Sequence, residues 1–148
     1  MNPCIFGIQT NKEFQQLKFR NAFIAKLDGA CCRNSNDFFS EIKLQFELPD
    51  YFGKNLDALY DCMLDLEWIT QEQIILYIEN ADQLLADEVN DPDLIDDLVT
   101  TLDEICQSWL LMENEEFTPK KLKIYLQPIS KFREVLERND IVYKILHV

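Results

Sequence analysis

The chain has 148 residues and a mass of 17.5 kDa, which suits one compact domain with a sizeable core. Its composition, with 47% hydrophobic and 28% charged residues but 3 glycines and 5 prolines, excludes a largely disordered or linker-rich chain. The net charge of −13 argues against direct binding to nucleic acid, whose phosphates would be repelled, and favours a cationic partner or simple solubility.

The negative charge is concentrated in the middle of the chain. Between Leu44 and Phe117 there are twenty acidic residues and a single basic one, Lys54. The first 43 residues carry six basic and four acidic side chains, and the last 31 carry seven basic and three acidic ones. Within one domain this distribution predicts a directional field, although a solvated acidic face is an equally good interpretation of the charge alone.

Cysteine usage and the lack of long apolar runs indicate a cytoplasmic protein. The five cysteines are odd in number, form no C-x-x-C motif and include a vicinal pair, Cys31 and Cys32, which is a poor disulfide candidate. No signal-peptide pattern opens the sequence, and no apolar run reaches the roughly 18 residues of a membrane helix. We therefore expect a soluble chain in a reducing compartment, with no membrane partner.

The first half of the chain predicts one strand and two helices. Residues 22–27 (AFIAKL) form a short apolar run before a turn signal, which is typical of a strand. A helix should follow, capped by Ser35 or Asn36 and ended by Leu48-Pro49, and Asn55 can cap the next one. The expected buried faces of the two helices consist of Phe38, Phe39, Ile42 and Phe46, and of Leu56, Leu59, Tyr60 and Met63.

The second half continues the alternation of strands and helices. It adds, in chain order, a buried strand at 74–78 (IILYI), a helix with Asp91 as N-cap and Pro92 as first residue that ends near Trp109, and a polar loop at 113–119. A strand at 121–126 (KLKIYL), a short helix capped by Ser130 that runs through Arg138, and a strand at 141–147 follow. The first twenty residues predict no element.

This order of elements predicts the α/β class, with a small three-stranded, mostly parallel sheet flanked by helices and an added C-terminal helix and strand. We expect a single domain over residues 1–148, with its core at about 22–126 and extensions at 1–21 and 127–148.

An enzyme is an unfavourable interpretation. The sole histidine, His147, is the penultimate residue, so a Ser/His/Asp centre, a Cys/His centre or a metal site is not expected. Three glycines cannot supply a phosphate-binding loop, and among 27 carboxylates some pair will lie at glycosidase distance by chance. We therefore predict no catalytic residues, no metal and no cofactor.

One segment, Leu48 to Cys62 (LPDYFGKNLDALYDC), indicates a binding surface. Its helix should present Asp57, Asp61 and Asp65 as one acidic stripe, although like charges at this spacing destabilise a helix. The helix dipole explains Asp57 in part, but Asp61 lies one turn deeper. Aromatic residues accompany the stripe: core packing is favoured for Phe52 and Tyr60, and exposure is expected for Tyr51.

The same segment resembles the signature of the barstar family of ribonuclease inhibitors. The resemblance implies a small parallel sheet with flanking helices, and a helix and preceding loop that enter the active-site cleft of a basic ribonuclease. It implies that Asp61 replaces the substrate phosphate, and that Glu104, with Asp103 as a rival, adds an acidic contact. The implied partner-binding residues are Tyr51, Gly53, Asn55, Leu56, Asp57, Tyr60, Asp61 and Glu104.

Some positions depart from the family pattern. Tyr60 replaces a common Trp and Lys54 replaces a common acid, which makes a different target enzyme plausible. The segment that contains Trp68 is also longer than in the family.

Elsewhere, the acidic run from Asp87 to Asp97 is expected to be mainly a solvated loop and helix start, and Cys62 and Cys106 are expected to be buried.

Two functions follow from the sequence. The first is a cytoplasmic immunity protein that binds a basic ribonuclease toxin, with 1:1 stoichiometry. The second is an acidic interaction module, or nucleic-acid mimic, that occupies a basic partner other than a nuclease. The first function concentrates affinity at Tyr51, Asp57 and Asp61, whereas the second distributes it over many acids, including those at 87–97.

Overall fold

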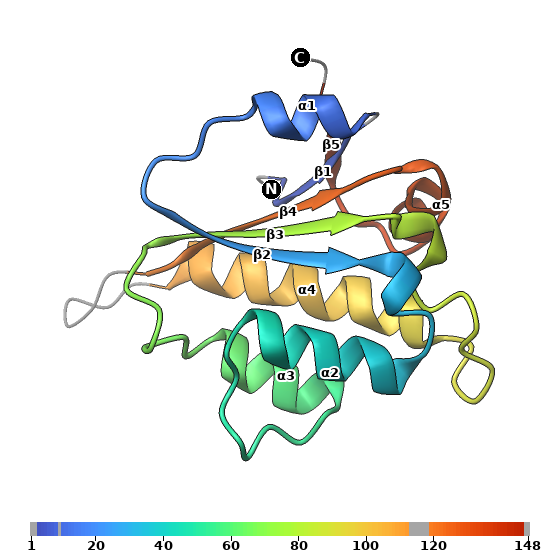
Figure 1. Ribbon diagram of the computed structural model, residues 1–148, viewed down its shortest axis with the longest axis horizontal. Coiled ribbons are helices and arrows are strands. Elements are labelled where there is room, and N and C mark those ends of the chain that lie inside the picture. Colours follow the sequence, from blue (N-terminus) through green and yellow to red (C-terminus); the bar gives the residue numbers. More distant parts are fainter. Residues whose placement is uncertain (1–2, 9, 113–118, 147–148) are drawn as a thin grey trace.

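The computed structural model describes residues 3–8, 10–112 and 119–146 and arranges them as one sheet flanked by helices (Figure 1). Within these residues the sheet has five strands in the order β2-β3-β4-β1-β5, and every neighbouring pair is parallel. The strands are β1 (Ile5–Gly7), β2 (Ala22–Asp28), β3 (Gln73–Glu79), β4 (Lys121–Leu126) and β5 (Tyr143–Ile145). The predicted class and the three central strands are confirmed.

The sheet is wider than the sequence predicted because β1 is part of it. This strand pairs with β4 on one side and β5 on the other, so the N-terminal segment holds the C-terminal strand in the sheet. The final strand is shorter than expected, and His147 lies outside the described residues.

Helices cover both faces of the sheet, as Figure 1 shows, with α2, α3 and α4 on one face and α1 on the other. The helices are α1 (Asn11–Gln16), α2 (Ser35–Gln45), α3 (Leu56–Met63), α4 (Leu94–Leu111) and α5 (Ser130–Arg138), with short 3-10 helices at Gly29–Cys31 and Ala81–Gln83. In the described part of the chain, no helix combines the length and the apolar character that crossing a membrane requires.

The central strand β3 is apolar throughout because both of its faces are covered. On the side of α2, α3 and α4, Ile74, Leu76 and Ile78 join the main core. On the other side, Ile75 and Tyr77 belong to a smaller core that α1 covers. There the Phe14 ring stacks on Tyr77 with ring centroids 3.8 Å apart. The N-terminal extension therefore covers a face that the central strands alone would leave exposed to water.

Three helix starts differ from the predicted caps. Asn34, not Ser35 or Asn36, caps α2, because its extended backbone lets its side chain accept a hydrogen bond from the Asp37 amide at 2.9 Å. Helix α4 begins at Leu94, since a turn from Asp91 O to Leu94 N at 3.1 Å precedes it. Helix α5 follows Ile129, so Ser130 is its first residue.

Helix α2 ends earlier than the proline at position 49 implied. Glu47 has a φ of 54°, which turns the chain out of the helix. The Leu48 amide donates to the Lys43 carbonyl at 2.9 Å and the Glu47 amide donates to the Leu44 carbonyl at 3.3 Å. This is the usual hydrogen-bonding of a helix that stops at a left-handed residue, and it directs the chain into the loop before α3.

The turns that follow β2 and β3 are in close backbone contact. A Cβ at Gly29 would overlap the Asn80 carbonyl, so only glycine fits there. The hydrogen bonds that join the two segments include Asn80 Nδ2 to Asp28 Oδ1 at 2.9 Å, Leu85 N to Cys32 O at 2.9 Å and Asp87 N to Arg33 O at 2.8 Å. The segment after β3 is thereby fixed beside the start of α2.

An ion pair joins α5 to the start of α4. The Arg138 guanidinium donates to both Asp96 carboxylate oxygens at 2.6 and 2.9 Å, and Asn139 Nδ2 donates to one of them at 2.8 Å. Hydrogen bonding from Arg138, followed by that from Asn139, lowers the pKa of Asp96 despite its partial burial. Asp96 is therefore not part of a purely solvated acidic run.

This lowered pKa predicts a pH-dependent stability difference for Asp96→Asn. The ionised form stabilises the native state above the ordinary carboxyl pKa of about 4, and this contribution is lost as pH falls through the lower native value. Asp96→Asn should therefore unfold at lower urea concentration than wild type at pH 7, and the gap should shrink towards pH 2. Asp97→Asn, at an exposed position next to it, serves as the control. A gap that is constant with pH would contradict the assignment.

Candidate functional site

The loop before α3 is folded around one buried aromatic residue. Phe52 is buried against the Phe39 ring, with centroids 6.2 Å apart, and its amide donates to the Pro49 carbonyl at 2.9 Å. Tyr51, next to it, is 79% exposed. The predicted burial of Phe52 and exposure of Tyr51 are confirmed, and the loop presents Tyr51 to solvent.

Asn55 is the N-cap of α3, as predicted. Its side-chain oxygen accepts a hydrogen bond from the Ala58 amide at 2.8 Å, and its amide nitrogen donates to the Gly53 carbonyl at 3.2 Å. Gly53 has no left-handed backbone, and a Cβ there would meet nothing closer than 3.4 Å. The fold therefore does not itself require glycine at this exposed position.

One side of α3 is fixed to α4. Leu59, Cys62 and Met63 are buried, and the Trp109 indole donates to the Met63 carbonyl at 3.0 Å. The Tyr60 hydroxyl lies 3.2 Å from Ser108 Oγ. Tyr60 is thus half-buried, and its hydroxyl connects the two helices.

The other side of α3 carries two exposed carboxylates, Asp57 and Asp61. They lie one turn apart, and neither makes a salt bridge with any residue that the structure describes. Lys54, the one basic residue of the acidic middle segment, lies with its ammonium 3.5 Å from Ser40 Oγ on α2. Asp57 and Asp61 are therefore a like-charge pair that no lysine or arginine in the described ranges neutralises.

The predicted acidic stripe is one residue shorter than expected. Helix α3 ends at Met63, with Leu64 as its C-cap, so Asp65 is exposed but lies beyond the helix. Leu66 then adopts a left-handed φ of 49° with its side chain buried. The chain turns to bury Leu66, so the helix ends before Asp65. The spacing of the charges alone did not predict this end.

The two candidate acids on α4 lie in different surroundings. Glu104 is exposed, and it precedes Ser108 by one turn on the helix side that contacts Tyr60. Asp103 is partly buried, and its burial raises the pKa of its carboxyl group. Its charge acts on the thiols of Cys4 and Cys106, which places it towards the β1 side of the helix. This arrangement favours Glu104 as the acid that accompanies α3.

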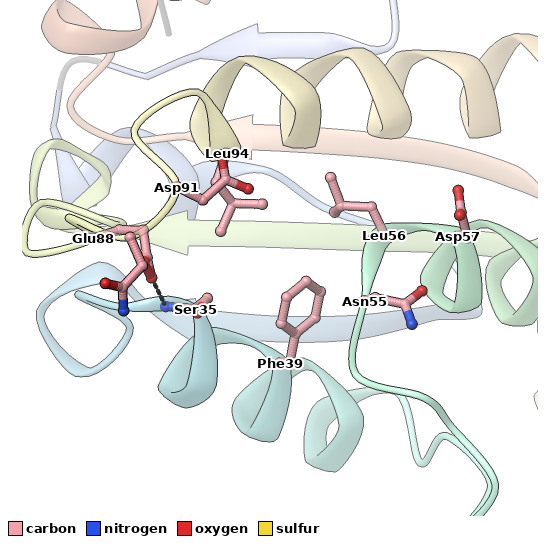
Figure 2. A pocket seen from close by; sticks show the side chains of 9 residues that line it. Ser35, Phe39, Asn55, Leu56, Asp57, Glu88, Asp91 and Leu94 are labelled. Carbon is pink, nitrogen blue, oxygen red and sulfur yellow. Dashed lines mark hydrogen bonds between the residues drawn. The ribbon is translucent and has the colours of Figure 1, made fainter.

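A groove lies beside the start of α3, as Figure 2 shows, and sequence reasoning missed it. It has a volume of about 340 Å³ and is lined by Ser35, Phe39, Asn55, Leu56, Asp57, Glu88, Asn90, Asp91 and Leu94. These residues come from α2, from the start of α3 with its N-cap, and from residues 88–94, which lead into α4. Because three distant parts of the chain form it, no single motif in the sequence could predict the groove.

Three other residues considered in the sequence, Trp68 and two cysteines, pack in or against the main core. The half-buried Trp68 donates its indole N–H to the Phe46 carbonyl at 2.9 Å, so its longer segment is attached to α2. Cys62 and Cys106 are buried, as predicted, and burial raises the pKa of the Cys62 thiol. In the described ranges, no group of three or more His, Cys, Asp or Glu side chains could hold a metal ion.

The acidic run at 87–97 contains both paired and exposed carboxylates. Asp87 pairs with Arg33 and Asp96 pairs with Arg138, at 2.7 and 2.6 Å. Asp91, Asp93 and Asp97 are exposed. The predicted solvated run therefore holds for part of the segment, while its two paired acids connect it to the turn before α2 and to α5.

The chain is similar to a known protein family and to a bacterial protein. Residues 22–127 match the model of the protein family described as "Barstar (barnase inhibitor)". Over 37 residues the chain is 40% identical to "Putative ribonuclease inhibitor YrdF" of Bacillus subtilis (strain 168), a match that covers 25% of the chain and 41% of that protein. The family match spans β2 to β4, whereas β1, α1, α5 and β5 lie outside it.

Proposed function

Because this chain belongs to the barstar family, we propose that it inhibits a basic ribonuclease toxin by inserting α3 and the preceding loop into the active site of the enzyme. Members of the family are inhibitors and not enzymes. The protein would act as the immunity or antitoxin partner of the toxin in the bacterial cytoplasm, with one inhibitor bound to one ribonuclease.

The observation that carries the proposal is the exposed pair of Asp57 and Asp61. A like-charge pair one turn apart destabilises a helix by a few tenths of a kcal/mol. The helix dipole compensates only Asp57, which lies in the first turn, so folding gives no reason to keep Asp61. Ribonucleases bind the RNA phosphate with cationic side chains, and carboxylates accept paired hydrogen bonds from guanidinium groups. Asp61 would occupy the position of the substrate phosphate, with Asp57 beside it.

The neighbouring residues suit a contact surface around these acids. Exposed Tyr51 offers a large, stiff side chain of the kind that interfaces favour. Asn55 and Leu56 lie at the helix start, where a partner that reaches Asp57 would meet them. Tyr60 and Glu104 extend the surface towards α4. The net charge of −13 would accelerate the encounter with a basic enzyme.

Gly53 would allow the close approach of the partner backbone, which predicts opposite effects of Gly53→Ala on binding and stability. The added methyl group should lower the affinity for the ribonuclease about fivefold to a hundredfold by steric overlap. The free energy of unfolding should stay unchanged or rise by about 0.4–1 kcal/mol. Surface plasmon resonance and urea denaturation measure the two quantities.

Gly29→Ala is the matched control for Gly53→Ala, because it adds the same methyl group where the fold itself requires glycine. It should lower stability by about 1–3 kcal/mol. Unchanged affinity of a folded Gly53→Ala variant would show that no partner backbone approaches this position.

The proposed function is tested by affinity capture. The wild-type chain and the Asp57→Ala/Asp61→Ala double variant are used as baits for lysate and medium of the cells that make it, and purified barnase is assayed in parallel. We expect the wild type to bind a basic protein that cleaves RNA and to inhibit it. The double variant should not retain this protein. If the captured partner has no ribonuclease activity and barnase is not inhibited, the proposal fails and a general acidic interaction module becomes the better explanation.

A further inference from the structure

We propose that the groove between α2, α3 and residues 88–94 is a second contact region of the inhibitor, beside the α3 surface. We propose that it accepts a lysine or arginine side chain of the ribonuclease. This inference rests on the proposed function, since it adds a contact to the same complex. The groove shares Asn55, Leu56 and Asp57 with the α3 surface, so a partner on α3 would lie at its opening.

The lining of the groove matches a long cationic side chain. Phe39, Leu56 and Leu94 supply apolar walls, and their side chains point into the space between the helices in Figure 2. Asp57, Glu88 and Asp91 supply carboxylates at its edge. Lysine and arginine bury an apolar stem while the charged end remains near polar groups. Their chemistry therefore fits both parts of the groove.

Two of the carboxylates at the edge, those of Asp57 and Asp91, are available to a partner. No lysine or arginine is among the lining residues, and neither Asp57 nor Asp91 makes a salt bridge with the residues in the described ranges. The nearby Arg33 is already paired with Asp87 at 2.7 Å. A cation entering the groove would therefore gain attraction without displacing an internal ion pair.

The groove is formed before any partner binds. Glu88 Oε1 accepts the Ser35 amide at 3.1 Å, and the Arg33–Asp87 pair adds two further hydrogen bonds at 2.7 and 3.0 Å. These contacts attach residues 87 and 88 to the start of α2. A preformed wall needs little ordering on binding, which favours affinity.

The test compares two charge reversals in the same segment. Asp91→Lys changes a residue that lines the groove, and Asp93→Lys makes the same change two residues away at an exposed position outside it. Because both alter the net charge equally, long-range attraction changes equally. The probe is the ribonuclease that wild type captures and inhibits, or barnase if that enzyme is inhibited. Asp91→Lys should weaken binding about tenfold or more through faster dissociation, and Asp93→Lys should stay within about threefold of wild type.

A cross-linking experiment gives a second measurement that does not depend on inhibition. A photoreactive benzoylphenylalanine at position 89, where Val89 is 83% exposed beside the groove, should attach to a ribonuclease peptide that contains or adjoins a lysine or arginine. The same group in place of Leu44, which is 68% exposed on α2 but outside the groove, should give no such product.

The outcomes separate the groove from the proposed function. Equal weakening by both charge reversals, or no cross-link from position 89, would overturn the groove while inhibition by the wild-type chain remains. If wild type inhibits no ribonuclease at all, the proposed function fails and the groove proposal fails with it.

Discussion

Replacing Asp61 by alanine should lower the affinity for the ribonuclease about thirtyfold to five-thousandfold. The loss corresponds to the roughly 2–5 kcal/mol that accompanies removal of one partner from a buried, hydrogen-bonded charge pair. Most of it should appear as faster dissociation, because the enzyme keeps a cationic site without its counter-charge. Stopped-flow association and competition dissociation kinetics measure both rates.

The same substitution should not destabilise the inhibitor. Asp61 is exposed, has no salt bridge within the described residues, and lies one turn from Asp57. Alanine removes that repulsion and has the higher helix propensity, so the free energy of unfolding should rise by up to about 1 kcal/mol. A residue that weakens the free protein and strengthens the complex is expected at a binding site.

Asp65→Ala is the control for Asp61→Ala. It removes the same charge from an exposed position just beyond the C-cap of α3. Its effect should be limited to slower association at low salt, within about fivefold. Equal losses from the two variants would mean that affinity is spread over the acidic surface, as a nucleic-acid mimic requires, and the α3 mechanism would be wrong.

The sequence predicted the α3 region well because its signals are local. Asn55 needs only the amide three residues later to cap the helix, and the burial of Phe52 with the exposure of Tyr51 follows from their places in a short loop. The family resemblance supplied the interpretation of Asp57 and Asp61, whose proposed partner is another molecule. Asp65 was wrongly added to the helix because charge spacing does not report where a helix ends.

What the sequence did not predict depends on contacts between distant segments. Strand β1 has three residues, too few for a periodic pattern, and its partner Ile124 lies more than a hundred residues after Ile5. The groove likewise combines Phe39, Leu56 and Asp91 from three elements. Such features become visible only when the sheet order is known, since local propensity contains no information about them.

The N- and C-terminal extensions lie outside the family match, yet we propose that they fold as one unit with it. Phe132 on α5 is 1% exposed and belongs to the same core as the buried side chains of β3 and α4. Phe132→Ala should therefore lower the free energy of unfolding by about 3–5 kcal/mol, through lost apolar burial and the cavity that remains. That is a large part of the roughly 5–15 kcal/mol that stabilises a typical domain.

The two tryptophans make this prediction decisive, because both report on the layer of α2, α3 and α4. Trp68 is hydrogen-bonded to the α2 C-cap carbonyl and Trp109 to the end of α3, whereas Phe132 is on α5. If the extensions are an integral part of the domain, Phe132→Ala should shift the urea midpoint equally by tryptophan fluorescence and by far-UV circular dichroism, and exposed Arg133→Ala should shift neither. If α5 were an appendage, the fluorescence transition would stay at its wild-type midpoint while circular dichroism recorded an earlier, smaller change.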